Sequence, residues 1–147
     1  MSKRILIMGL PGAGKTTLAN ELKQQLQKEG NTVKWLNADE VRQIYNDWDF
    51  SKEGRIRQSV RMRELADKFI TDYVICDFVA PLVEMRNNFK ADWTIWVDTI
   101  KESRFDDTNN MFIPPNINEY DFHVTEQNAE RWATIILNSI YERNYIS

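Results

Sequence analysis

The sequence lacks the features that mark secreted and membrane proteins. Its 147 residues contain one cysteine, Cys76, so no disulfide can form within the chain, and this fits a reducing compartment. The apolar run at residues 5–8 is too short for a signal sequence or a membrane span. We therefore expect a cytoplasmic protein with no membrane partner. Cys76 is expected to be a buried strand residue, with a special chemical role as the alternative.

The sequence also lacks an excess of charge of one sign. Its 19 Lys and Arg against 22 Asp and Glu give a net charge of −3. A slightly acidic chain has no general attraction for nucleic acid, so no nucleic-acid partner is expected. Any phosphate group must therefore be bound by a locally built site.

Short apolar runs alternate with helical patterns along the chain. Strands are expected at residues 5–8, 32–36, 73–78, 93–97 and 122–124. Helices are expected at residues 15–29, 39–45, 52–69, 82–89 and from 125 to about 145. This alternation predicts an α/β fold of three layers, α/β/α, in which a mostly parallel sheet of about five strands is covered by helices on both faces. Ligands bind such sheets at the carboxyl ends of the strands.

The second half of the chain carries two weaker patterns. Residues 101–115 are rich in Asp, Asn and Pro and are expected to form a mobile, lid-like loop rather than a regular element. Thr125 is expected to cap the last helix, with Ile135, Ile136 and Ile140 facing inward. The length and the absence of a linker predict a single domain covering residues 1–147.

Glycine is scarce, and three of the five glycines fall within residues 9–14. Residues 9–16 match G-x-x-x-x-G-K-S/T between an expected strand and an expected helix, which predicts a P-loop NTPase fold. In such a loop the main-chain N–H groups surround phosphate oxygens and the helix start adds its positive dipole. Lys15 is expected to neutralise the β and γ phosphates of ATP, and the Thr16 hydroxyl to bind Mg²⁺. The expected ATP-binding residues of this loop are Gly9, Leu10, Pro11, Gly12, Ala13, Gly14, Lys15 and Thr16.

Two carboxylates follow expected strands. Asp77 ends the apolar run 73–76 as in a Walker-B segment, so we expect it beside the Mg²⁺, with a cap of the following turn as the alternative. Asp39 follows the second strand and is the candidate catalytic base for an attacking hydroxyl, with a helix N-cap as the alternative. Arg42 lies at helical spacing from Asp39 and could hold an anionic substrate.

The helix expected at 52–69 carries Arg55, Arg57, Arg61 and Arg63. Such a row is either a solvated helix face or a set of cations that converges on the acceptor side of a phosphoryl transfer. Arg55 and Arg61 are the functional candidates.

Over roughly residues 3–100 the chain resembles the adenylylsulfate kinase family of P-loop kinases, which transfer phosphate from MgATP to the 3′-hydroxyl of adenylylsulfate. Residues 9–17 resemble that family's P-loop, which adds Thr17 to the ATP contacts. Residues 36–42 resemble its L-D-G-D-x-x-R segment, residues 50–61 its F-S-x-x-D-R-x-x-N-x-x-R segment, and residues 78–86 its F-I-S/A-P-x-x-x-x-R segment. The resemblance implies ATP and Mg²⁺, nucleotide substrates and a homodimer.

The resemblance also implies roles for individual residues. Asp39 inherits the catalytic base role and Phe50 the stacking on the substrate adenine. The catalytic role of Lys15 and the metal role of Thr16 and Asp77 are those that their motifs already predict. The implied substrate-binding residues are Asp39, Arg42, Phe50, Arg55, Gln58, Val79, Ala80, Arg104 and Phe112.

The chain departs from the family pattern at several positions. Asn37 and Gly54 each replace an acid, Ala38 a glycine and Gln58 an asparagine. The family's long lid, with its R-D-x-K-G-L-Y signature, is shortened to residues 101–115. Ala80 stands where the family has serine, so no phosphoserine is expected there.

Three functions stay open at this point. The first is phosphorylation of adenylylsulfate to 3′-phosphoadenylylsulfate. The second keeps the kinase chemistry but changes the acceptor to another nucleoside, nucleotide or metabolite. The third is nucleotide binding without catalysis. A guanine-specific switch lacks its usual parts, because the chain contains no N-K-x-D and no D-x-x-G.

Overall fold

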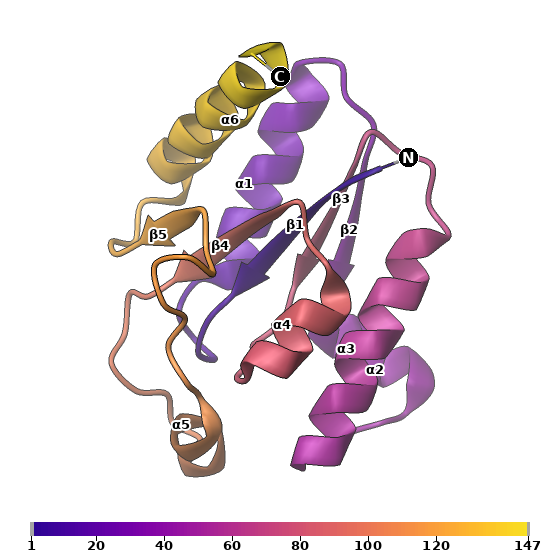
Figure 1. Cartoon of the computed structure of the whole chain (residues 1–147), viewed down its shortest axis with the longest axis vertical. Helices are drawn as coiled ribbons and strands as arrows, with labels where there is room; N and C mark the ends of the chain where they lie inside the picture. Colours follow the sequence, from indigo (N-terminus) through magenta and orange to yellow (C-terminus); the bar gives the residue numbers. More distant parts are fainter. Residues whose placement is uncertain (1, 147) are drawn as a thin grey trace.

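The computed structural model describes residues 2–146, and the side chains of residues 2–143. It contains a five-stranded parallel sheet in the order β2-β3-β1-β4-β5 (Figure 1). The strands are β1 (Lys3–Met8), β2 (Val33–Asn37), β3 (Tyr73–Asp77), β4 (Trp93–Val97) and β5 (Phe122–Val124). The expected α/β/α fold is confirmed. Of the expected single domain 1–147, Met1 and Ser147 lie outside the described residues.

Helices cover both faces of the sheet. They are α1 (Lys15–Lys28), α2 (Ala38–Tyr45), α3 (Lys52–Asp67), α4 (Val83–Phe89), α5 (Asp106–Met111) and α6 (Ala129–Ile146). Figure 1 shows α1 and α6 together on one side of the sheet and α3 and α4 on the other. In the part of the chain that the structure describes, no helix is long and apolar enough to cross a membrane.

The alternation of side chains along β1 explains the two-sided core. Ile5 and Ile7 point into the cluster with α1 and α6, while Leu6 and Met8 point into the cluster with α3 and α4. All four side chains are fully buried, as expected for a central parallel strand. Cys76 is a buried residue of β3, as predicted, and it lies in the cluster with α3 and α4. Burial raises the pKa of its thiol.

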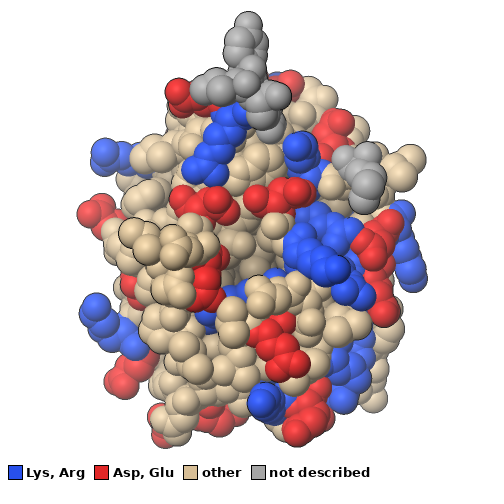
Figure 2. Space-filling view, in the orientation of Figure 1, with Lys and Arg blue, Asp and Glu red and all other residues tan. Residues whose placement is uncertain are grey.

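Charged side chains of both signs are interspersed on the face of the molecule that Figure 2 shows. On the face shown in Figure 2, Lys and Arg alternate with Asp and Glu, and neither sign forms an extended field. This face therefore offers no extended positive field to attract a phosphate group.

The segment expected to be a loop contains a short helix, α5. Asp106 and Asp107 occupy its first turn, where negative side chains favour the helix dipole. Thr108 is buried and accepts a hydrogen bond from Arg55 at 2.7 Å. The expectation of no regular element at residues 101–115 was therefore wrong, because this tertiary contact and the acidic first turn stabilise one.

The start and the inner face of α6 also differ from the expectation. The helix begins at Ala129, and Asn128 rather than Thr125 caps it by accepting from the backbone N–H of Arg131 at 3.3 Å. Ile136 and Ile140 are fully buried, but Ile135 is 43% exposed. Ile135 lies outside the buried face of α6, whose residues recur at helical spacing.

The glycine that follows β1 is expected to be important for the stability of the fold. Gly9 has φ 150°, and a Cβ there would lie 2.3 Å from the Val97 carbonyl oxygen. We expect Gly9→Ala to lower the free energy of unfolding by about 2–4 kcal/mol, measured by urea denaturation. The control is Gly30→Ala, because Gly30 also has positive φ but faces open space, and a loss of about 1 kcal/mol is expected. Equal losses in both variants would contradict this interpretation.

Candidate active site

A cleft of about 1010 Å³ lies at the carboxyl edge of the sheet. One wall is the glycine loop between β1 and α1, and the others come from the ends of β2 and β3, the α2–α3 loop and the segment before α5. The lining residues include Pro11, Gly12, Gly14, Lys15, Thr16, Asn37, Asp39, Trp48, Phe50, Arg55, Asp77, Val79, Glu102, Arg104, Phe105 and Asp107. A cleft of this size can hold more than one small-molecule group.

The glycine loop curls because three of its residues adopt positive φ. Gly9, Gly12 and Gly14 have φ values of 150°, 83° and 100°. Gly14 is the N-cap of α1 and has no side chain to cap the helix. The first N–H groups of α1 are therefore available to an anion, and the helix dipole adds to the attraction.

Lys15 is the one buried cation at the base of this loop. Its ammonium group donates a hydrogen bond to the Leu10 carbonyl at 3.0 Å. Burial lowers the pKa of Lys15 to about 8, while the carboxylates of Asp77 and Asp39 act in the opposite direction. Additional negative charge from a phosphate group would stabilise the protonated form.

The end of β3 places a carboxylate near a hydroxyl. Asp77 is buried and accepts hydrogen bonds from the Trp35 indole at 2.6 Å and the Asn37 amide at 3.2 Å. Burial raises the pKa of Asp77, and these two hydrogen bonds oppose the rise. The same amide lies 3.5 Å from the Thr16 hydroxyl. The partners of Asp77 are thus side chains of β2, and none of the hydrogen bonds found for the described residues makes it a cap of the turn after β3.

Thr16 and Asp77 form a donor set that fits Mg²⁺. The described residues contain no group of three or more His, Cys, Asp or Glu that could hold a metal ion alone. Mg²⁺ commonly takes one or two protein oxygens and fills its shell with water and substrate phosphates. One hydroxyl and one carboxylate beside a phosphate-binding loop match that requirement.

Asp39 lies in the first turn of α2 and faces the cleft. Asn37 is the N-cap of α2, because its side chain accepts from the Glu40 N–H at 3.1 Å. The alternative interpretation of Asp39 as the helix cap is therefore wrong. The carboxylate of Asp39 is exposed and close enough to Lys15 to act on its charge.

Two of the four candidate arginines, Arg42 and Arg61, hold the framework instead of lining the cleft. Arg42 is buried and donates to the carbonyls of Asp47 and Asp49. Arg61 forms an ion pair with Asp47 at 2.9 Å. Of the row on α3, Arg55 alone is among the residues that line the cleft.

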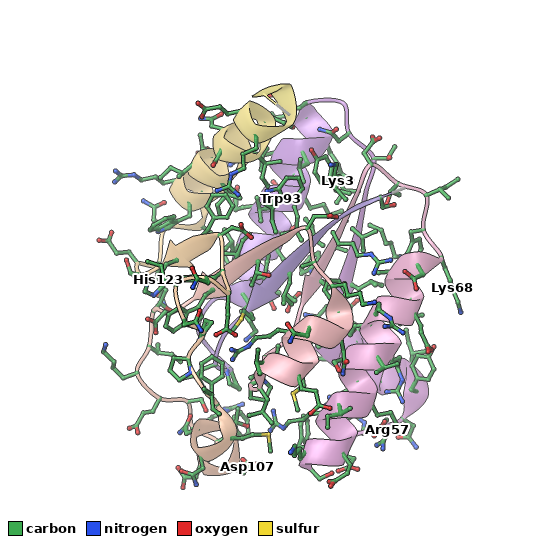
Figure 3. All side chains as sticks on the ribbon, viewed as in Figure 1. Lys3, Arg57, Lys68, Trp93, Asp107 and His123 are labelled. Atoms are coloured by element: carbon green, nitrogen blue, oxygen red, sulfur yellow. The ribbon has the colours of Figure 1, made fainter. Side chains whose placement is uncertain are left out.

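Arg55 joins the two walls of the cleft. It donates to the Phe50 carbonyl at 2.8 Å and to the Thr108 hydroxyl at 2.7 Å, and lies 3.8 Å from the Asp107 carboxylate. In Figure 3, Asp107 on α5 lies at the same end of the molecule as Arg57 on α3. The lid segment thus packs against the start of α3.

The remaining predicted substrate-binding residues divide into two groups. Val79 and Arg104 line the cleft, as do Asp39, Phe50 and Arg55. Gln58 is buried and donates to the Ala38 carbonyl, and Ala80 is buried with φ 48°. Phe112 packs on the guanidinium of Arg86, which donates to the Ile113 carbonyl at 2.6 Å. Arg42, Gln58, Ala80 and Phe112 are absent from the cleft lining, so their substrate contacts stay predictions.

The structure adds residues that the sequence did not single out. Trp48, Glu102, Phe105 and Asp107 line the cleft that contains Lys15 and Asp39. A second cavity of about 310 Å³ shares the glycine loop and reaches Val124 at the end of β5 and residues 126–129 after it. Thr17, an expected ATP contact, lines this cavity rather than the larger cleft. No sequence motif marks Trp48, Glu102, Phe105 or Asp107, so the sequence offered no signal for their place in the cleft.

The parallel sheet, the curled glycine loop at the start of α1 and the adjoining cleft define a P-loop kinase fold. A family model described as adenylylsulphate kinase matches residues 1–101. The chain belongs to the adenylylsulfate kinase family.

Individual relatives agree with this assignment. A probable adenylyl-sulfate kinase of Aeropyrum pernix is 38% identical over 86 residues, which cover 56% of this chain and 47% of that protein. The adenylyl-sulfate kinase of Halothermothrix orenii is 25% identical over 166 residues, covering 95% of this chain and 89% of the relative. A cytidine diphosphoramidate kinase of Campylobacter jejuni is 32% identical over 68 residues, covering 46% and 39%. The chain thus spans less than half the length of two of these three relatives.

Solved structures show the same fold. The APS kinase CysC of Mycobacterium tuberculosis in complex with AMPPNP and APS superposes with a TM-score of 0.76 at 18% identity, over 95% of this chain and 98% of that one. At this identity the likeness establishes the fold alone.

The lowered pKa of Lys15 predicts a pH-dependent affinity for nucleoside triphosphates. In the free protein the ammonium loses its proton as the pH rises through about 8, whereas bound phosphates favour the charged form. We expect the affinity for MgATP to be constant below pH 8 and to fall by up to about tenfold per pH unit above it. Calorimetric titrations between pH 7 and 9.5 would measure this slope.

The matched control is Lys15→Arg, because a guanidinium keeps its charge over this whole range. Its affinity should not fall with pH, whatever its absolute value. A wild-type affinity that is flat from pH 7 to 9.5 would remove Lys15 from the phosphate site.

Proposed function

We propose that this protein transfers the γ-phosphoryl group of ATP to the 3′-hydroxyl of adenylylsulfate and so forms 3′-phosphoadenylylsulfate. The observation that carries the proposal is the exposed carboxylate of Asp39 in the same cleft as the glycine loop, in a chain that belongs to this kinase family. The lone thiol, buried in β3, fits a cytoplasmic location.

Each part of the cleft has a role in this proposal. The loop of residues 9–17 binds the phosphates of ATP through its free main-chain N–H groups and the ammonium of Lys15, and the second cavity, beside Thr17, receives the nucleoside end. Thr16 and Asp77 hold Mg²⁺, which when bound neutralises phosphate charge. Arg55, Arg104 and Phe50 form the acceptor side of the cleft.

Asp39 acts as the general base. It accepts the proton of the acceptor hydroxyl as that oxygen forms a bond to the γ-phosphorus. The bond between the γ-phosphorus and the β–γ bridging oxygen breaks, and ADP leaves with the electron pair. Phosphoryl transfer needs positioning and charge stabilisation more than covalent chemistry, and these residues supply both.

A second acceptor class has one observation in its favour. The C. jejuni relative is named for a cytidine diphosphoramidate substrate, so members of this sequence neighbourhood differ in acceptor. Incubation of the protein with γ-labelled ATP and a panel of acceptors separates the two kinases. Adenylylsulfate should be labelled fastest, and preferential labelling of a cytidine nucleotide would favour the second. ATP binding without label transfer to any acceptor would indicate a binding protein.

The base assignment predicts the effect of Asp39→Asn. Loss of the carboxylate should lower kcat by roughly 10²–10⁴-fold while the affinity for MgATP is retained. The matched control is Glu40→Gln, because Glu40 is also exposed on the first turn of α2 but does not line the cleft; its kcat should be unchanged. A normal turnover number for Asp39→Asn would restrict this residue to a structural role.

A further inference from the structure

The loop between α2 and α3 presents two aromatic side chains to the cleft. Trp48 is 50% exposed and Phe50 is 41% exposed, and both line the cleft that contains Asp39 and Lys15. Their ring centroids lie 6.4 Å apart with the ring planes at 48°. A flat group that stacks on one ring would therefore meet the other ring at a tilt.

Ion pairs fix this loop against α3. Arg57 donates to the Asp47 carboxylate at 2.8 Å and pairs with Asp49 at 3.3 Å, so both neighbours of Trp48 are held. Hydrogen bonds from Arg57, followed by those from Arg61, keep the pKa of Asp47 well below its usual range. The chain on both sides of Trp48 is therefore tied to α3.

The start of α3 packs closely against the backbone of the α2–α3 loop, because a glycine stands at position 54. A Cβ at Gly54 would lie 2.1 Å from the Asp49 carbonyl oxygen, so a larger residue there would push the loop away. On the other side, Arg42 donates to the carbonyls of Asp47 and Asp49. The backbone on both sides of Trp48 is thus held by buried residues.

The two rings differ in what already contacts them. Phe50 has the guanidinium carbons of Arg42 and Arg55 at 4.4 Å and 5.3 Å from its ring centroid. For Trp48, no hydrogen bond from the indole N–H and no ring contact other than Phe50 is found among the described residues. The indole therefore offers both a free aromatic face and a free donor to a ligand in the cleft.

We propose that Trp48 is an acceptor-binding residue: its indole adds a second ring to the stacking surface that the family resemblance assigns to Phe50, and the two rings form an aromatic platform for the nucleobase of the acceptor. This inference rests on the proposed function, since it concerns the acceptor of the same site. Stacking on aromatic rings recognises any base through its π-face, and a loop that is tied to α3 lowers the entropy cost of ordering it on binding.

Binding of AMP with the ATP site filled by Mg·AMPPNP tests the platform without requiring catalysis. By calorimetry, Trp48→Ala should weaken AMP binding by roughly 5- to 100-fold and leave the affinity for Mg·AMPPNP unchanged. Ile44→Ala is the matched control, because Ile44 is 78% exposed on α2 outside the cleft, and it should bind AMP as the wild type does. Ribose 5-phosphate, which lacks the base, should bind the wild type about as weakly as AMP binds Trp48→Ala.

Fluorescence locates the contact. AMP should quench the tryptophan emission of the wild type, and Trp48→Phe, which keeps a stacking ring, should bind AMP but lose most of that quenching. Unchanged AMP affinity in Trp48→Ala, absence of AMP binding to the wild type at millimolar concentration, or equal binding of ribose 5-phosphate and AMP would overturn the inference. A wild-type protein that binds AMP through Trp48 but does not phosphorylate adenylylsulfate would refute the proposed acceptor and leave the platform intact.

Discussion

The site depends on one buried ammonium group, that of Lys15, at the base of the glycine loop. Its one hydrogen-bond partner among the described residues is the Leu10 carbonyl at 3.0 Å, and burial lowers its pKa to about 8. The carboxylates of Asp77 and Asp39 act on it only through space. A cation held in this way gains most from a ligand that brings several negative oxygens close to it, and a triphosphate supplies them. The curl of the loop, which requires glycine at position 9, positions both the ammonium and the N–H groups.

Buried arginines build the walls of the cleft. Arg42 holds the α2–α3 loop, and Arg86 holds the end of the lid segment through the Ile113 carbonyl. Arg55 contacts both walls through Phe50 and Thr108. Because a buried guanidinium needs partners for its donors, arginines that bind the framework have fewer donors left for a substrate. Arg55 and Arg104 line the cleft, so we propose these two arginines for contacts to an anionic acceptor.

The sequence predicted the sheet and the glycine loop well because their signals are local. Apolar or β-rich runs indicated the five strands, and the G-x-x-x-x-G-K-S/T motif between a strand and a helix identified Lys15 and Thr16. The helix α5 could not be predicted, since it depends on a contact between distant segments. The capping of α2 by Asn37 could not be predicted either, since neighbouring residues compete for the cap position. Trp48 was missed because its exposure toward the cleft follows from the ion pairs of Arg57 with the two aspartates beside it. No pattern in the α2–α3 loop itself encodes that direction.

The most direct test of the account is the binding of a nucleoside triphosphate to the purified protein with and without magnesium. Calorimetry with MgATP should give saturable binding at one site per chain, and chelation of the metal should weaken it, because Thr16 and Asp77 are the predicted protein ligands of the ion. No measurable affinity for any nucleoside triphosphate in the presence of magnesium would contradict the account at its base.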